Sequence, residues 1–201
     1  MNIIFDLGGV VFDWVPDAFI ESVYDNPVVR ELVKKELLQH SDWVELDRGT
    51  LDKSSAIKRC AQRSGLFESQ VAPLLDALPD ALLPKLDTVK LIEDLAHMGH
   101  HLYVLSNMHS AAKEHLLHHY DFWHHFKGKV FSCDIQQVKP DAIIFEHILA
   151  TYKLDPQQSI FIDDMYENVE AAARFGITPL LFKSPAQCKE ELVKLNCLLL
   201  H

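Results

Sequence analysis

Polar side chains that can do chemistry follow apolar residues at four places along this 201-residue sequence. They are a carboxylate, a hydroxyl beside an amide, an ammonium group and a pair of carboxylates: Asp6, Ser106 with Asn107, Lys139, and Asp163 with Asp164. A carboxylate can attack a phosphate monoester once positive groups neutralise the phosphoryl oxygens. The four segments together could therefore carry out phosphoryl transfer.

The first three segments supply a nucleophile and the groups that bind a phosphate. Asp6 is the predicted nucleophile, forming an aspartyl-phosphate that water then hydrolyses. Ser106 is predicted to donate its hydroxyl to the phosphoryl group, with Asn107 and the backbone at Gly9 as further phosphate-binding groups. Lys139 would place a positive charge beside both the nucleophile and the transferring group.

The fourth segment predicts a metal site. Asp163 and Asp164, together with Asp6, offer the oxygen ligands that Mg²⁺ prefers in proteins. Each segment also has a plainer interpretation: Ser106 could satisfy a backbone amide, Lys139 could be a solvated charge, and the aspartate pair could cap a helix. Their occurrence together favours the catalytic interpretation.

Apolar runs bounded by turn residues predict the strands that position these groups. Ile3-Ile4-Phe5 is typical of a strand buried in a parallel sheet, and Gly8 and Gly9 allow a tight turn after it. Further strands are predicted at residues 101–105, 130–132, 159–162 and 177–182, with helices between them. The predicted fold class is α/β, a doubly wound, Rossmann-like parallel sheet. Such sheets bind ligands at the carboxyl ends of their strands.

A helical block interrupts this pattern after the first strand. Helical spacing appears at residues 19–24, 28–38, 54–64 and 69–78, with breaks at Pro27, Gly49, Gly65 and Pro79. We therefore predict a core domain of residues 1–15 and 81–201 and a small helical cap of residues 16–80. Because the block begins beside Asp6, it could lie over that carboxylate as a lid.

In order and spacing the four motifs resemble those of the haloacid dehalogenase-like (HAD) hydrolases, subfamily IA, and the resemblance covers nearly the whole chain. It implies a Mg²⁺-dependent phosphatase, that is, a phosphoric monoester hydrolase with an α-helical cap. It also implies that Asp163 binds the metal directly, that Asp164 acts through water or orients the lysine, and that Gly8 contributes its backbone carbonyl. Asn168 would support the same network.

Gly8 is also where the sequence departs from most of these phosphatases. They carry there a second aspartate, which serves as general acid and base and is typically worth ~10²–10⁴-fold in rate. Asp13 and His109 are candidate replacements, as is a donor from the substrate or water. Alternatively, the leaving oxygen of an anomeric or acyl phosphate would need less help.

The Asp-Leu-Gly-x-Val form of the first motif narrows the resemblance, as do the Ser-Asn and Lys-Pro motifs and the segment Glu45-Leu46-Asp47-Arg48-Gly49. These features are similar to the HAD subgroup that includes the bacterial α-D-glucose-1-phosphate phosphatase, which implies a sugar phosphate as substrate. Arg48 could read that substrate, although this segment, with Asp42, is also typical of a solvated charged turn.

Two rival functions stay open at this stage. A metal-free haloacid dehalogenase would use Asp6 to attack carbon, but a metal-free site gains little from the negative charge of Asp163 and Asp164. A catalytically silent member that only binds a ligand would explain the glycine at position 8.

Composition limits the surroundings and partners of the protein. A net charge of −10 argues against nucleic-acid binding. The four cysteines are widely spaced, which predicts free thiols in a cytoplasmic protein, and neither a signal peptide nor a membrane span is expected. A monomer that acts on a small phosphorylated metabolite fits these features. The histidines of segment 97–125, with His115 and His119 spaced to share a helix face, leave zinc or nickel binding open.

Overall fold

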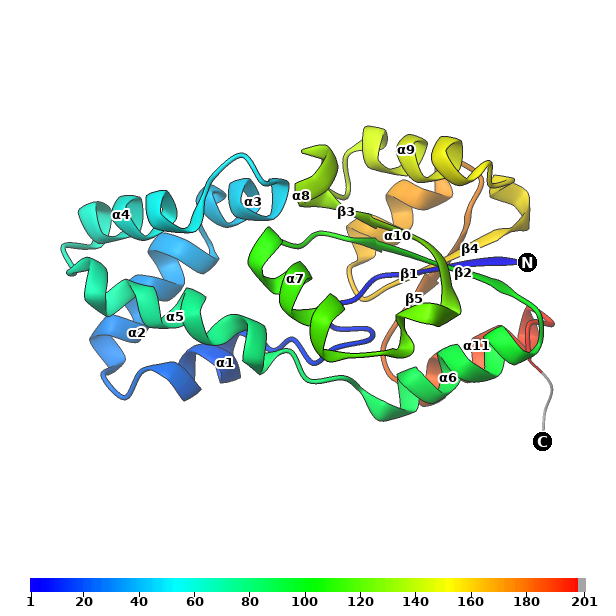
Figure 1. Cartoon of the computed structure of the whole chain (residues 1–201), viewed down its shortest axis with the longest axis horizontal. Coiled ribbons are helices and arrows are strands. Elements are labelled where there is room, and N and C mark those ends of the chain that lie inside the picture. Colours follow the sequence, from blue (N-terminus) through cyan, green and yellow to red (C-terminus); the bar gives the residue numbers. More distant parts are fainter. Residues whose placement is uncertain (199–201) are drawn as a thin grey trace.

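The computed structural model describes residues 1–198 and contains a five-stranded parallel sheet (Figure 1). Its strands are β1 (Asn2–Phe5), β2 (His101–Ser106), β3 (Phe126–Phe131), β4 (Ser159–Asp163) and β5 (Thr178–Leu181). Their order across the sheet is β3-β2-β1-β4-β5, and every neighbouring pair is parallel. This is the predicted α/β, Rossmann-like fold.

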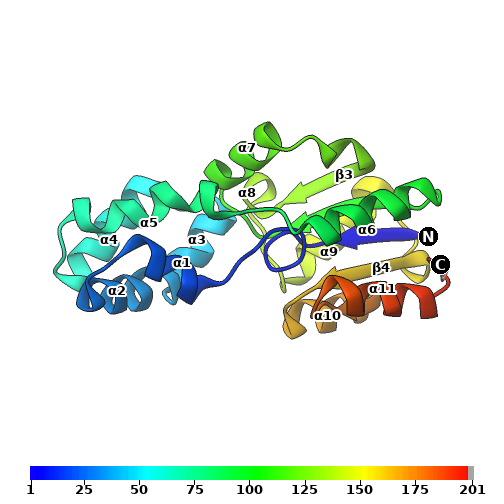
Figure 2. The same cartoon turned by 90° about the horizontal axis from the view of Figure 1, so that it is seen from below.

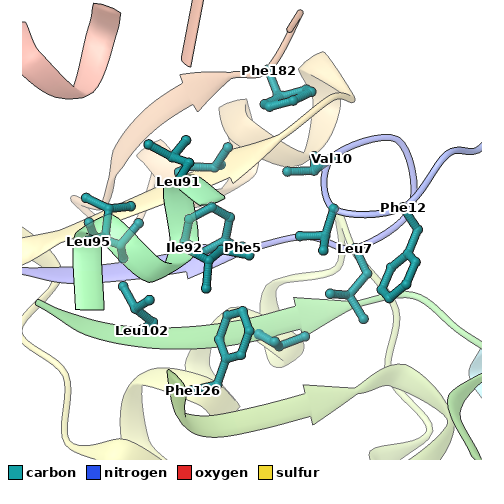
Figure 3. Packing of buried hydrophobic residues seen from close by; sticks show 14 of the residues in the cluster. Phe5, Leu7, Val10, Phe12, Leu91, Ile92, Leu95, Leu102, Phe126 and Phe182 are labelled. Atoms are coloured by element: carbon teal, nitrogen blue, oxygen red, sulfur yellow. The ribbon is translucent and has the colours of Figure 1, made fainter. Parts of the chain in front are cut away.

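Helices cover both faces of the sheet, and alternating side chains of the central strand β1 pack against them. Ile3 and Phe5 pack with helices α6 (Leu86–His97), α7 (Ser110–His119) and α11 (Pro185–Lys194), in the cluster drawn in Figure 3. Ile4 points the other way and packs with helices α9 (Ala142–Tyr152) and α10 (Tyr166–Ala173). Successive side chains of a strand point to opposite faces of the sheet. The apolar run of β1 therefore packs against the helices on both faces.

The chain changes direction across the sheet at β1. From β1 it proceeds to β2 and β3 on one side, and it then returns to β4 on the other side. Phe5 is in register with Val104 of β2 and with Ile162 of β4. Asp6 and Asp163, which follow the paired residues Phe5 and Ile162, therefore lie side by side at the carboxyl ends of their strands. Open α/β sheets bind their ligands at this edge.

Five helices between β1 and α6 lie together at one end of the molecule (Figures 1 and 2), and their buried side chains form a hydrophobic cluster of their own. They are α1 (Pro16–Val23), α2 (Pro27–Val33), α3 (Ser41–Arg48), α4 (Lys53–Ser64) and α5 (Glu68–Ala81), with a π turn at Lys34–Leu38. Fully buried side chains of this cluster include Val33, Leu37 and Leu74. The helical content expected of this segment is present, and the boundaries of a core and a cap stay a prediction.

The structure differs from the predicted elements in three places. α3 was not predicted, because it contains few apolar residues. The signal for it was Gly49, which ends the helix in the left-handed conformation (φ 76°) that favours glycine. α5 continues through Pro79, since a proline near a helix end removes only one hydrogen bond. β3 begins four residues earlier than predicted, and Ser132 instead opens the short helix α8 (Ser132–Ile135).

Short 3₁₀ turns at Phe122–His125 and Pro156–Gln158 complete the described elements. All four cysteines are free thiols. Within residues 1–198, every helix is too short or too polar to cross a membrane.

Phe145 of α9 tests how firmly this fold is packed. Its ring is fully buried, 5.6 Å from the Phe161 ring of β4 and 5.8 Å from the Phe175 ring. We expect Phe145→Ala to lower the free energy of unfolding by about 3–5 kcal/mol in urea denaturation, because it leaves a cavity. Phe67→Ala is the matched control, since that ring is 77% exposed. Equal effects of the two substitutions would contradict this packing.

Candidate active site

The turn after β1 fixes the position of Asp6. The Leu7 carbonyl accepts hydrogen bonds from the amides of Val10, Val11 and Phe12 at 3.2, 2.8 and 2.8 Å. The Asp6 amide donates to the Ile162 carbonyl of β4 at 2.9 Å. A closed loop of this kind holds the Asp6 carboxylate at the edge of the sheet.

Gly9 is required in this loop by backbone conformation and by space. Its φ is +76°, and a Cβ atom added there would lie 2.3 Å from Asp164 Oδ2. The Gly9 amide donates to the Phe12 carbonyl at 2.9 Å, so the loop itself uses this predicted phosphate-binding group. Gly9 thus gives the carboxylate of Asp164 room beside Asp6.

Lys139 joins two of the predicted carboxylates. Its Nζ lies 2.8 Å from Asp6 Oδ1 and 2.6 Å from Asp163 Oδ2, and its side chain is 1% exposed. The Asn107 side chain holds the lysine backbone from both sides: its Nδ2 donates to the Lys139 carbonyl at 2.9 Å and its Oδ1 accepts from the Lys139 amide at 2.8 Å. Asn107 therefore positions Lys139.

Three carboxylates gather around the ammonium group. Asp6, Asp163 and Asp164 each place an oxygen within 4.8 Å of the others. Asn168 Nδ2 donates to both Asp163 oxygens at 3.0 and 3.1 Å, and the Met165 amide donates to Oδ1 at 2.8 Å. The described residues form one such group of metal-ligand type, and it contains no histidine.

Burial and mutual charge effects shift the pKa values of the groups in this cluster. Burial and the neighbouring Asp163 raise the pKa of Asp6 to about 7, against the opposing effect of Lys139. Burial and Asp163 also raise the pKa of Asp164. Burial disfavours a charged Lys139, but the carboxylates of Asp163 and Asp6 outweigh it and raise the pKa of the ammonium group. Three carboxylates facing one ammonium group suit a divalent cation.

Ser106 lies at the end of β2 with its hydroxyl unpaired. The residue is 1% exposed, and its Oγ has no hydrogen-bond partner within the described structure. Buried hydroxyls normally have partners. Ser106 therefore offers a free hydroxyl donor, as a phosphate-binding residue must.

A cavity of about 70 Å³, partly open to solvent, lies where the helical segment faces the core. Gly8, Asn107 and His109 line its core side, with Met108 and Ala112. The other lining residues are mostly apolar: Trp43, Asp47 and Leu78 come from the helical segment, and Trp14 and Leu82 come from the two connections between that segment and the core. The Trp14 and Trp43 rings stack with centroids 5.9 Å apart and 10° between their planes.

Other candidates from the sequence lie outside this cluster. Asp13 pairs with Lys85 at 2.9 Å and is 59% exposed, and Arg48 pairs with Asp141 at 3.3 Å. The rings of His115 and His119 stack on each other 3.9 Å apart.

Asp47 is a cavity-lining carboxylate that sequence reasoning missed. The only signal for it was its place in the charged segment before Gly49, where it resembled a solvated turn residue.

Comparison with known proteins agrees with this geometry. A family model of haloacid dehalogenase-like hydrolases matches residues 1–176. The sesquiterpene phosphatase astK of Aspergillus oryzae is 29% identical over 195 residues, which cover 93% of this chain and 92% of that protein. The drimenol cyclase drtB of Aspergillus calidoustus is 28% identical over 96% of this chain, which spans 36% of that larger protein.

Solved structures share the fold at low sequence identity. A HAD family enzyme of Bacteroides thetaiotaomicron, in complex with magnesium and inorganic phosphate, superposes with a TM-score of 0.71 at 19% identity, over 90% of this chain and 93% of that chain. The L-2-haloacid dehalogenase of Xanthobacter autotrophicus superposes with a TM-score of 0.67 at 18% identity, over 96% and 82%. From the match over residues 1–176, the chain belongs to the haloacid dehalogenase-like hydrolases.

Proposed function

We propose that this hydrolase is a Mg²⁺-dependent phosphatase that removes phosphate from a small phosphorylated metabolite through an aspartyl-phosphate on Asp6. The observation that carries the proposal is the buried Lys139 ammonium between Asp6 and Asp163, beside a third carboxylate. The pairing supplies a nucleophile, a positive charge for the phosphoryl group and a set of metal ligands in one place.

The residues present fit Mg²⁺. Asp6 and Asp163 would bind it directly, Asp164 would act through water, and the Gly8 carbonyl would add a fourth oxygen. Hard cations prefer such oxygen ligands, and three carboxylates share a single ammonium group in this cluster. When bound, the cation would neutralise charge on the phosphoryl oxygens.

The remaining chemistry belongs to side chains of the chain itself. An oxygen of Asp6 would attack phosphorus while the bond to the leaving oxygen breaks. Lys139 and the free hydroxyl of Ser106 would hold the phosphoryl oxygens. Water would then attack the aspartyl-phosphate, releasing inorganic phosphate and restoring Asp6.

Both rival functions account less well for the cluster. A metal-free dehalogenase would leave two carboxylates around Lys139 in excess, which costs free energy without a cation. A silent binding protein would not need a buried nucleophile paired with a lysine and a free serine hydroxyl at the same edge. Buried groups of this kind are typical of catalytic sites.

The helical segment α1–α5 is proposed to act as the cap of this site, with residues 16–80 forming it and residues 1–15 and 81–201 forming the core. It supplies Trp43, Asp47 and Leu78 to the cavity beside Gly8. A cap in this position would exclude water from the reaction and select the organic part of the substrate.

Two substrate classes follow from different observations. Resemblance of the motifs favours a sugar phosphate, whose hydroxyls need polar partners. The cavity instead presents the stacked rings of Trp14 and Trp43 and the side chains of Leu78 and Leu82, which favour an apolar organic group. The relative named as a sesquiterpene phosphatase supports the second class.

Removing the nucleophile tests the proposal directly. We expect wild-type protein to release phosphate from esters with Mg²⁺, and we expect EDTA or Asp6→Asn to abolish release, because each removes an essential group. Phosphate release would be measured on a panel that includes glucose 1-phosphate and a fifteen-carbon isoprenyl monophosphate. Turnover that persists in Asp6→Asn, or that is unchanged by EDTA, would contradict the mechanism.

Gly9→Ala tests the arrangement of the acidic cluster. The new Cβ would meet Asp164 Oδ2 at 2.3 Å, so we expect weaker Mg²⁺ binding by calorimetry and a loss of stability of about 1–2 kcal/mol from the left-handed backbone. Gly65→Ala is the matched control, because Gly65 has φ +75° but no atom within 4 Å of an added Cβ. The control should lose stability alone, and equal Mg²⁺ affinities in the two variants would contradict the arrangement.

Trp43→Ala separates the two substrate classes. Loss of the aromatic wall should lower kcat/KM for the isoprenyl monophosphate at least about tenfold, or ~1.4 kcal/mol, while kcat/KM for a small alkyl phosphate changes little. Val44→Ala on the same helix is the control, since Val44 is 46% exposed and does not line the cavity. An equal loss on both substrates would argue against an apolar organic group.

A further inference from the structure

We propose that Asp47, near the end of α3, is the general acid and base of this site. The proposal rests on the proposed phosphatase function and deepens it, because Gly8 leaves the turn after β1 without a side chain for proton transfer. A leaving alkoxide needs a proton. A phosphatase that acts on unactivated esters therefore needs a proton donor next to the leaving oxygen.

The position of Asp47 suits this role. Asp47 lines the same cavity as Gly8, Asn107 and His109, although it comes from the helical segment. Its carboxyl group interacts electrostatically with Asp6 and Lys139 and contacts the backbone of His109. Asp47 thus lines the same cavity as the turn that follows Asp6, close enough for its carboxyl group to be affected by the charge of Asp6.

Contacts with the core hold Asp47 in place. Its carbonyl accepts a hydrogen bond from Ser132 Oγ, which in turn accepts one from the Met108 amide at 2.8 Å. The next residue, Arg48, pairs with Asp141 at 3.3 Å. A Cβ at Gly49 would lie 2.8 Å from the Cys133 carbonyl, so this end of α3 lies directly against α8. A fixed backbone is what a positioned proton donor requires.

The protonation state of Asp47 supports the role. Burial raises the pKa of this carboxyl group to about 7, with a further raising effect of Asp6 and opposing effects of the His109 backbone and Lys139. Both the acid and the carboxylate form are therefore available near neutral pH, as a group that donates and then accepts a proton needs.

The other candidates for proton transfer fit less well. His109 is neutral at pH 7, because burial lowers its pKa to about 4, and its Nδ1 accepts from the Ala112 amide at 3.4 Å. Its unpaired Nε2 can donate a hydrogen bond but holds no acidic proton to transfer. Asp13 is largely exposed and pairs with Lys85.

The proton balance closes over the two steps. As Asp6 forms its bond to phosphorus, the bond from phosphorus to the ester oxygen breaks and the Asp47 proton moves to that oxygen, which leaves as an alcohol. The Asp47 carboxylate then takes a proton from the attacking water as the bond from phosphorus to Asp6 breaks. Inorganic phosphate leaves and Asp47 is again protonated.

Leaving-group dependence in Asp47→Asn tests the proposal. With an alkyl phosphate, whose leaving oxygen needs a proton, we expect steady-state turnover to fall by about 10²–10⁴-fold. With 4-nitrophenyl phosphate, whose leaving group needs none, a rapid burst of about one nitrophenolate per enzyme should remain, followed by slow turnover. A purely structural role would reduce the burst as well. Glu45→Gln is the control, a partly exposed carboxylate of α3 paired with Arg59.

Restoring an aspartate at position 8 gives a second test. A Cβ at Gly8 would meet only Trp14, at 3.9 Å, and its backbone is not left-handed, so a side chain fits there. We expect Gly8→Asp to raise the alkyl phosphate turnover of Asp47→Asn by at least about tenfold.

Unchanged turnover in Asp47→Asn, a lost burst, or no gain from Gly8→Asp would each overturn the role of Asp47 and leave the phosphatase intact. Absence of phosphate release from wild-type protein would instead contradict the proposed function itself.

Discussion

The contact on which the rest of the structure depends is the buried ammonium group of Lys139 between the carboxylates of Asp6 and Asp163. The two carboxylates follow adjacent strands in register, so the sheet itself brings like charges together. Without the lysine, the repulsion would be uncompensated in a buried site, where removing one partner of an ion pair is costly. Asn107 secures the lysine backbone, which explains why an amide follows β2 at this point.

The order of the strands places the start of the helical segment next to this site. β1 is central, and the chain reverses across the sheet between β1 and β4, so the loop after β1 opens at the switch point. An insertion there leaves the sheet intact and faces the carboxylates. Its own hydrophobic cluster lets it keep its shape, while Ser132 and Asp141 hold the end of α3 against the core.

The cavity therefore combines two kinds of surface from two parts of the chain. The core supplies the polar residues Asn107 and His109, and Asn107 connects this surface to Lys139 of the charged cluster. The helical segment and its two connections to the core supply the stacked tryptophans and the leucines, with Asp47 as a carboxylate among them. The apolar lining and the charged cluster are made of different residues. Affinity for the organic part of a substrate and reactivity at phosphorus can therefore be changed by separate substitutions.

The sequence by itself determined the α/β fold and the positions of Asp6, Ser106 and Asp163, because buried parallel strands have continuous apolar sequences and their carboxyl ends must meet at one edge. Lys139 was predicted from its motif, since it lies in the loop between α8 and α9 and not at a strand end. Apolar spacing also predicted a helical segment after β1. Only the tertiary structure decided that Asn107 holds Lys139, that the Trp14 and Trp43 rings line a cavity, and that Asp47 lines the same cavity. Such contacts depend on how a helix is packed and turned against another part of the chain, and local spacing carries no information about that orientation.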